Sequence, residues 1–232
     1  MNTLFLTLFR PVKAFNQLKT ESFSAMSLLM IILLVIINLI LMIPVTEKVL
    51  QITTASMPLN SDQLEMMAQV SHTMRYVQIF GSIITSIVMF LFYALLLYLL
   101  VLISKSKLDF KKALQLIICC YIALAIGSLV NTAFLYMRGI DAIQHIYDIT
   151  LTGINLLTST DKVGMTMYVF LSYINLFQLW FVALISIGLT ILADMKPVKA
   201  TIISILFWLV TVLFPVISVY FSQAVLEKAG MM

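Results

Sequence analysis

The chain has 232 residues, of which 62% are hydrophobic and 10% charged, with a formal net charge of +4. A soluble domain of this length cannot bury so large an apolar fraction, so the composition excludes an ordinary soluble globule and indicates an integral membrane protein. The charged residues are clustered, and five long uncharged runs lie between the clusters. Each run exceeds the roughly 20 residues that a helix needs to cross about 30 Å of hydrocarbon.

The runs show no alternation of polar and apolar residues, which argues against a transmembrane barrel. We therefore predict an all-α fold, a polytopic membrane helix bundle with five transmembrane helices. The predicted spans cover residues 24–45, 77–103, 113–137, 165–193 and 200–225. They belong to one domain over residues 22–232, with an amphipathic segment before it at 1–21 and helical outer loops at 46–75 and 138–163.

The amphipathic segment places Val12, Phe15 and Leu18 on one side of a helix, with Lys13 and Gln17 on another. This pattern is typical of a helix that lies on a membrane surface, so we predict an N-terminal interfacial helix on the inner leaflet. The two outer loops are longer than a connection requires. We expect them to fold back as a cap over the bundle.

The basic residues predict the orientation. Nine of the 14 Lys and Arg residues precede the first span or lie between spans two and three or four and five. The positive-inside rule then places the N-terminus in the cytoplasm and, after five spans, the C-terminus outside. Candidate contacts to lipid or to a partner on the inner face are Arg10, Pro11, Lys13, Lys105, Lys107, Lys111, Lys112, Lys196 and Lys199.

One short basic signature occurs twice on this face. Residues 10–15 read RPVKAF and residues 196–201 read KPVKAT, each at the start of an apolar segment. Proline is tolerated in the first turn of a helix, where its missing N–H would have no partner in any case. The repetition follows either from this general preference at helix starts or from duplication of an ancestral unit.

No Asp, Glu, Lys, Arg or His lies inside the predicted spans, although charged groups there mark proton relays and ion pathways. The chain also lacks the Walker A, HExxH and GxSxG motifs. We therefore predict no enzyme activity, no cofactor and no catalytic or metal site. His72 and His145, with Asp148 near the latter, provide no tight ligand set.

The spans carry neutral polar residues instead. Candidates for intramembrane polar contacts are Asn38, Tyr121, Asn131, Asn175 and Gln178. Such side chains usually hydrogen-bond across helices, and a ligand pocket around Asn175 and Gln178 is the alternative. Cys119 and Cys120 are adjacent in the third span, where packing and palmitoylation both stay open.

The stretch Leu8–Phe15, LFRPVKAF, resembles the Phe-x-x-Pro-x-x-Ala-Phe signature that opens bacterial members of the YIP (Ypt-interacting protein) family. The third span of that family often carries Gly-Tyr and then Pro; here Cys120-Tyr121 keeps only the tyrosine. The Asp-Leu-Tyr-Gly-Pro motif of eukaryotic members is absent, so Rab binding is not carried over. The resemblance implies five helices with the N-terminus inside and the C-terminus outside.

The chain resembles the bacterial YknW-like type within this family, which is similar to accessory proteins of MacAB-like ABC exporters. This implies a non-enzymatic accessory protein of the bacterial cytoplasmic membrane that assists assembly or regulation of an exporter of toxic peptides. Its partners would be membrane lipids and exporter subunits, with no nucleic acid, and a homo-oligomer stays open. The alternative is a small-solute transporter or channel with a neutral polar pocket.

Overall fold

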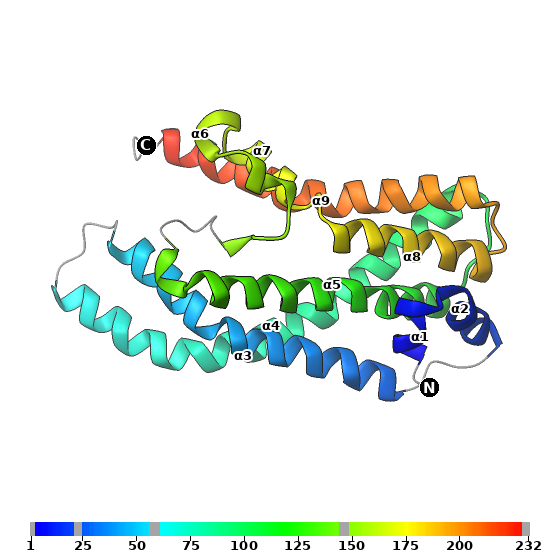
Figure 1. Ribbon diagram of the computed structural model, residues 1–232, viewed down its shortest axis with the longest axis horizontal. Helices are drawn as coiled ribbons and strands as arrows, with labels where there is room; N and C mark the ends of the chain where they lie inside the picture. Colours follow the sequence, from blue (N-terminus) through cyan, green and yellow to red (C-terminus); the bar gives the residue numbers. More distant parts are fainter. Residues whose placement is uncertain (1–2, 21–24, 56–60, 144–148, 229–232) are drawn as a thin grey trace.

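The computed structural model describes residues 3–20, 25–55, 61–143 and 149–228. These residues form helices and connecting turns and contain no strand (Figure 1). The longer helices are α2 (Pro11–Thr20), α3 (Ala25–Ala55), α4 (Ser61–Ile103), α5 (Phe110–Arg138), α8 (Leu176–Leu192) and α9 (Pro197–Lys228). The shorter ones are α1 (Thr3–Phe9), η1 (Ile140–Ala142), η3 (Ile154–Leu157), α6 (Thr160–Val163) and α7 (Met165–Ser172).

Four of the described helices are long and apolar enough to cross a membrane. The candidate spans are Leu29–Ile52, Ile83–Ile103, Phe110–Arg138 and Pro197–Gln223, and α8 is a shorter apolar helix. Helices are favoured in these runs because hydrocarbon offers no partner for backbone polar groups, so each segment must bond its own. The predicted all-α polytopic bundle is confirmed.

The central helix is α5, which packs against α3, α4 and α8 (Figure 1). Its most apolar stretch is 61% buried, against 11% for that of α3 and 22% for those of α4 and α9. Large side chains that are fully buried in this core are Leu97, Leu116, Ile117, Ile122, Leu184, Ile185 and Phe207. Within these stretches, most residues of α3, α4 and α9 therefore lie outside the protein core, where lipid can contact them.

Cys119 and Cys120 lie in the core of α5 as free, fully buried thiols. A buried thiol has no access to the membrane interface, where palmitoylation takes place. Their position therefore favours the packing interpretation.

The N-terminal helices α1 and α2 lie against one end of the bundle (Figure 1). α1 packs against α5, and α2 packs against α8. Ala14, Phe15 and Leu18 of α2 are buried, whereas Val12 is 56% exposed. The predicted amphipathic helix is present, but most of its apolar face contacts protein and not the leaflet, because α5 and α8 leave an apolar surface at this end of the bundle.

The predicted fourth span, a single helix over residues 165–193, is two helices. α7 ends at Ser172 and α8 begins at Leu176. Between them Asn175 has extended backbone angles, φ −143° and ψ 166°, and its side-chain oxygen accepts a hydrogen bond from the Gln178 N–H at 2.9 Å. Asparagine is among the best helix N-caps, so it starts a new helix here.

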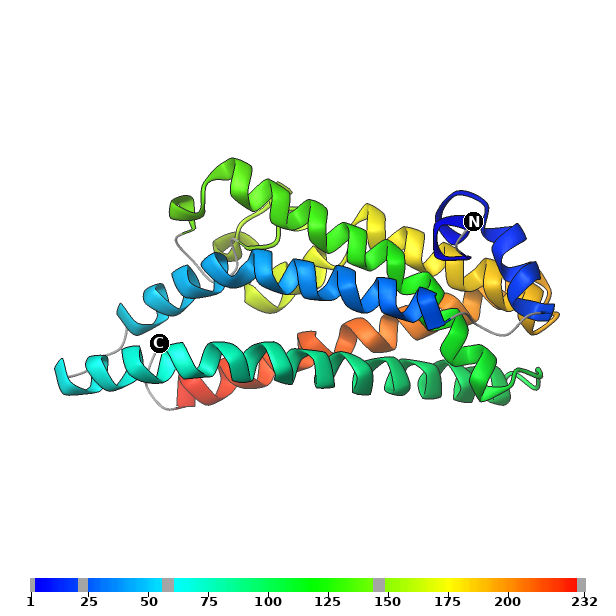
Figure 2. The same cartoon turned by 90° about the horizontal axis from the view of Figure 1, so that it is seen from below.

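The first outer loop prolongs two helices. α3 continues through Pro44 to Ala55, and α4 begins at Ser61. Both extend beyond the other helices at that end of the bundle, so the described parts of this loop do not fold back as the expected cap (Figure 2). Residues 46–55 continue the helix of the first span and residues 61–75 lead as a helix into the second, so each span is prolonged beyond the bundle.

The second outer loop returns into the bundle. The Asn131 amide of α5 donates to the Ile149 carbonyl at 2.8 Å and accepts from the Leu151 N–H at 2.7 Å. These bonds hold the chain before η3 alongside α5. Part of the outer loop predicted at 138–163 lies outside the described residues, and His145 and Asp148 lie there.

Candidate functional site

The two copies of the basic signature adopt the same backbone conformation. α2 begins at Pro11 and α9 begins at Pro197. In each copy the N–H of the alanine donates to the carbonyl of the basic residue that precedes the proline. The Ala14 N–H lies 3.1 Å from the Arg10 carbonyl, and the Ala200 N–H lies 3.0 Å from the Lys196 carbonyl. The proline therefore occupies the first helical turn in both places, where it costs no hydrogen bond.

The side chains at matching positions of the signature are also similarly placed. Ala14 and Ala200 are fully buried, while Val12 and Val198 are 56% and 73% exposed. A buried small residue lets each helix start approach the bundle closely. The same turn presents its valine outward, so each copy marks a helix start at the same end of the molecule.

The lysines of the two copies differ in their contacts. The Lys199 ammonium donates to the Ser104 carbonyl and, at 2.8 Å, to the Ser106 hydroxyl. Ser104 follows the end of α4, where helix carbonyls lack internal partners and a positive charge is favourable. Lys13, at the equivalent position of the first copy, is exposed. Lys199 therefore joins α9 to α4, and Lys13 is available to other molecules.

The turn that receives Lys199 is itself a well-formed helix end. The Lys105 N–H donates to the Leu102 carbonyl at 2.9 Å, and the Ser106 N–H donates to the Val101 carbonyl at 3.2 Å. With φ of +58° at Lys105, this is the Schellman arrangement that ends many helices. The turn holds its backbone groups internally and leaves the Lys105 side chain exposed.

Lys112 closes the end of α2. Its ammonium donates to the Leu18 carbonyl and, at 3.4 Å, to the Lys19 carbonyl. The Lys19 ammonium in turn pairs with Asp194 at 2.5 Å, with side chains 43% and 78% exposed. Through these contacts α2 is connected both to α5 and to the turn between α8 and α9.

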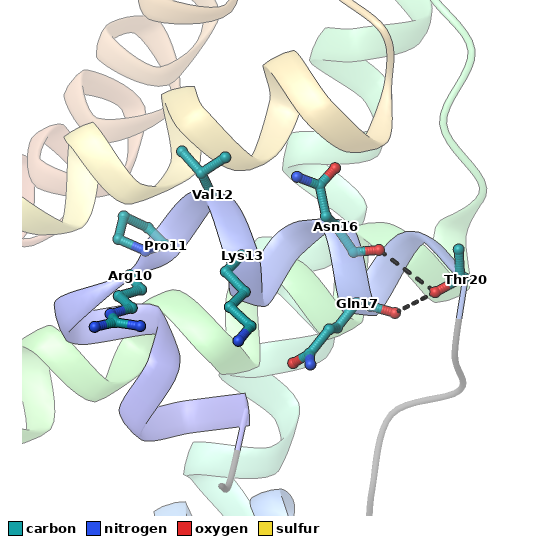
Figure 3. A pocket seen from close by; sticks show the side chains of 7 residues that line it. All are labelled: Arg10, Pro11, Val12, Lys13, Asn16, Gln17 and Thr20. Carbon is teal, nitrogen blue, oxygen red and sulfur yellow. Dashed lines mark hydrogen bonds between the residues drawn. The ribbon is translucent and has the colours of Figure 1, made fainter.

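The other basic residues of this end are exposed. They are Arg10, Lys13, Lys105, Lys107, Lys111 and Lys196. Arg10 and α2 also line a surface pocket of 620 Å³, in which Arg10, Lys13 and Gln17 point to the same side of the helix (Figure 3). We call these six exposed residues the basic end. They are supplied by the connection between α1 and α2, by α2, by the α4–α5 turn with the first turn of α5, and by the α8–α9 turn.

Within the membrane-spanning region, Asn38 connects α3 to α5. Its amide donates to the Ser128 hydroxyl at 2.8 Å, and its oxygen accepts from the Thr132 hydroxyl at 2.9 Å. Such bonds between helices stabilise a membrane bundle by about 0.6 to 2 kcal/mol each. Asn38 thus has a structural contact across the helices.

The Asn175 side chain is occupied in starting α8. Besides accepting from the Gln178 N–H, it donates to the Ser172 carbonyl at 3.2 Å. Asn175 and Gln178 are therefore brought together as a helix cap, and this contact favours a structural role for the pair over a ligand pocket.

Tyr121 packs its ring edge-on against Phe90, with the ring centroids 4.7 Å apart.

A close backbone approach lies beside the break between α7 and α8. Gly153 bridges to Asn175, and a β-carbon at Gly153 would lie 2.6 Å from the Ser172 carbonyl oxygen. Next to it, the Asn155 amide donates to the Thr150 carbonyl at 3.2 Å. The Asn155 side-chain oxygen is buried and has no hydrogen-bond partner in the part of the chain that the structure describes.

Several of these residues were not predicted from the sequence as site residues. Of the residues that were predicted, Asn175 and Gln178 also form a helix-start pattern, which is a sequence signal for the break in the fourth span. Lys19, Asp194 and Asn155 carry no local signal, because their contacts depend on how distant segments pack. In the described ranges no three His, Cys, Asp or Glu side chains gather into a group that could hold a metal ion.

Comparison with known proteins gives one family match. A model of the Yip1 domain matches residues 5–219, which is most of the chain. Neither a curated protein nor a solved structure matches it.

Proposed function

Because the chain belongs to the Yip1 family of membrane proteins, we propose that it is a non-enzymatic accessory protein that helps to assemble or regulate a membrane complex. The partner is a MacAB-like ABC exporter of the bacterial cytoplasmic membrane, acting in the export of toxic peptides or in resistance to them. The exporter assignment comes from the resemblance to YknW-like proteins.

The basic end is the observation that carries a binding role. Lys112 and Lys199 hold α2, α4, α5 and α9 together at this end. The exposed cations are thereby displayed on a fixed frame, which reduces the ordering cost of binding a partner. Large apolar side chains such as Phe9, 79% exposed, lie beside them. This combination suits a partner that presents both an acidic surface and membrane-spanning helices.

The topology that we propose has five crossings, with α7 and α8 together forming the fourth. α2 and the end of α9 lie at opposite ends of the bundle, as an odd number of crossings requires (Figure 1). The positive-inside rule then places the basic end in the cytoplasm. In a variant without Cys119 and Cys120, a cysteine at Lys13 should resist a membrane-impermeant thiol reagent in right-side-out vesicles, and one at the exposed Asp161 of α6 should react. The opposite pattern would refute this orientation.

The partner is tested by affinity purification from native membranes in mild detergent. We expect exporter subunits to co-purify with the wild-type protein and to be strongly reduced with the double variant Arg10→Gln, Lys13→Gln. Lys162→Gln, which changes an exposed lysine at the other end of the bundle, is the matched control and should behave as wild type. Recovery of the protein alone would contradict the exporter role, and equal recovery of exporter subunits with both variants would contradict binding through the basic end.

A small-solute transporter is the second candidate, and one observation favours it. Discontinuous transmembrane helices form the substrate sites of many transporters. The α7–α8 break lies near the buried side-chain oxygen of Asn155, which has no hydrogen-bond partner among the described residues. Solute flux by the purified protein in liposomes, abolished by Asn155→Leu in a variant that still folds, would support a transporter; flux equal to that of empty liposomes would exclude it.

A further inference from the structure

A groove of 470 Å³ lies between the last turns of α4 and the first turns of α9. Its walls include Leu100 and Ile103 from α4 with Ile202 and Leu206 from α9. Ile103 is 76% exposed and Ile202 is 54% exposed, both within candidate membrane spans. A groove of this kind in hydrocarbon is filled by an apolar chain, since an empty one would lose dispersion contacts along its walls.

The groove is polar at one end and apolar along the rest of its length. The polar end holds Lys196, Lys199 and Ser104, and the apolar part continues along α9 to Leu206. Ten residues of helix span about 15 Å, which is half of the roughly 30 Å hydrocarbon thickness. The groove therefore matches one leaflet in length, with its polar end at the level of the headgroups.

The polar end carries a positive charge that the protein does not neutralise. Lys196 is exposed, and its ammonium has no hydrogen bond or ion pair within the described ranges. Lys105 is exposed on the turn that Lys199 binds. Asp194, two residues before Lys196, is already paired with Lys19 at 2.5 Å. Asp109 on the α4–α5 turn is also exposed, but its single negative charge does not balance the positive charges of Lys105 and Lys196.

We propose that this groove binds one anionic phospholipid. One acyl chain lies between α4 and α9 against Ile103, Ile202 and Leu206. The phosphate lies at the Lys196 ammonium, with Lys105 contributing long-range attraction. Basic pockets between transmembrane helices at a membrane surface bind anionic headgroups in this way.

The lining residues favour a lipid over a transmembrane helix of a partner. Membrane helices pack closely through Gly, Ala, Ser and Thr, whereas this groove is lined mainly by Leu, Ile and Val. The Ser104 carbonyl at its polar end is already bonded to Lys199. A flexible acyl chain fits such branched walls better than a second helix backbone does.

The test is a lipid titration of the purified full chain in mild detergent, followed by native mass spectrometry. Phosphatidylglycerol and phosphatidylcholine with identical acyl chains are the two probes. We expect phosphatidylglycerol to bind about fivefold or more tightly, since one lysine near an anionic surface contributes about 1 kcal/mol. Lys196→Gln should remove most of this preference, with Lys111→Gln, another exposed lysine of the basic end, as the matched control.

A second pair of variants tests the groove itself. Ile202→Trp should weaken both lipids by filling the groove, whereas Ile205→Trp should not, because Ile205 is 43% exposed on the same helix but does not line the groove. Equal binding of the two lipids by the wild type, or equal effects of the two Trp variants, would overturn the proposal. If Ile202→Trp lowers the unfolding temperature, Ile202→Phe replaces it. The result does not depend on the exporter partner, whose test uses Arg10 and Lys13.

Discussion

The Lys199 ammonium lies 2.8 Å from the Ser106 hydroxyl and also bonds the Ser104 carbonyl, so the first turn of α9 closes the end of α4. Removing this charge leaves the carbonyl without its partner. We expect Lys199→Gln to lower the free energy of unfolding by about 1–3 kcal/mol, because hydrogen bonds to charged groups are among the stronger ones. Thermal unfolding in detergent measures it, with Lys13→Gln at the same position of the other copy as control.

The contact between Gly127 and Phe177 makes the packing of α5 on α8 sensitive to a single methyl group. A β-carbon at Gly127 would lie 2.6 Å from Cγ and 2.7 Å from Cβ of Phe177. Since Cβ is fixed to the backbone, the helices would have to separate. We expect Gly127→Ala to cost about 1–3 kcal/mol of stability in thermal or denaturant unfolding.

Gly81 provides the matched control, because a β-carbon there would meet no atom of the described part of the structure within 4 Å. Gly81→Ala should leave stability unchanged or raise it by up to about 1 kcal/mol through helix propensity. Similar losses at both glycines would show that the close approach of α8 is not what matters.

Lys105 adopts a left-handed backbone conformation, with φ of +58°, at the end of α4. A residue with a side chain is strained in this region and glycine is not. We expect Lys105→Gly to raise the free energy of unfolding by about 0.5–1 kcal/mol, because glycine relieves this strain. Lys107→Gly on the same turn should lower stability slightly; an equal loss in both variants would contradict the assigned turn.

Asn38 and Thr132 share a hydrogen bond of 2.9 Å between α3 and α5. A double-mutant cycle of Asn38→Leu and Thr132→Val should give a coupling energy of about 0.5–2 kcal/mol. Unfolding of the four proteins in the same detergent supplies the values. A coupling near zero would mean that the two side chains act independently.

The candidate site was only partly predictable. The repeated signature indicated two helix starts at one end, and Pro11 and Pro197 do begin α2 and α9. From the sequence, all lysines of the inner face were expected to be equivalent surface charges. Lys112 instead bonds a carbonyl 94 residues away, and Lys199 bonds one 95 residues away. Contacts between segments so far apart leave no local pattern.

The break in the fourth predicted span shows a different limit. Residues 165–193 are uncharged throughout, and no proline or glycine marks the point at which α7 ends. Asn175 could equally have faced another helix, as Asn38 does. The returning chain at Gly153 forms a bridge to Asn175, and this tertiary contact decides between a helix break at Asn175 and a side-chain contact to another span.

The sequence by itself determined that this chain is a helical membrane protein with a basic end, because hydropathy and charge act locally on each segment in a bilayer. Tertiary structure alone decided that α5 is the central helix, that α2 buries Phe15 against protein, and which lysines stay exposed. These outcomes depend on which apolar surfaces and helix ends meet. Every span offers similar apolar surface, so only the packed bundle selects among them.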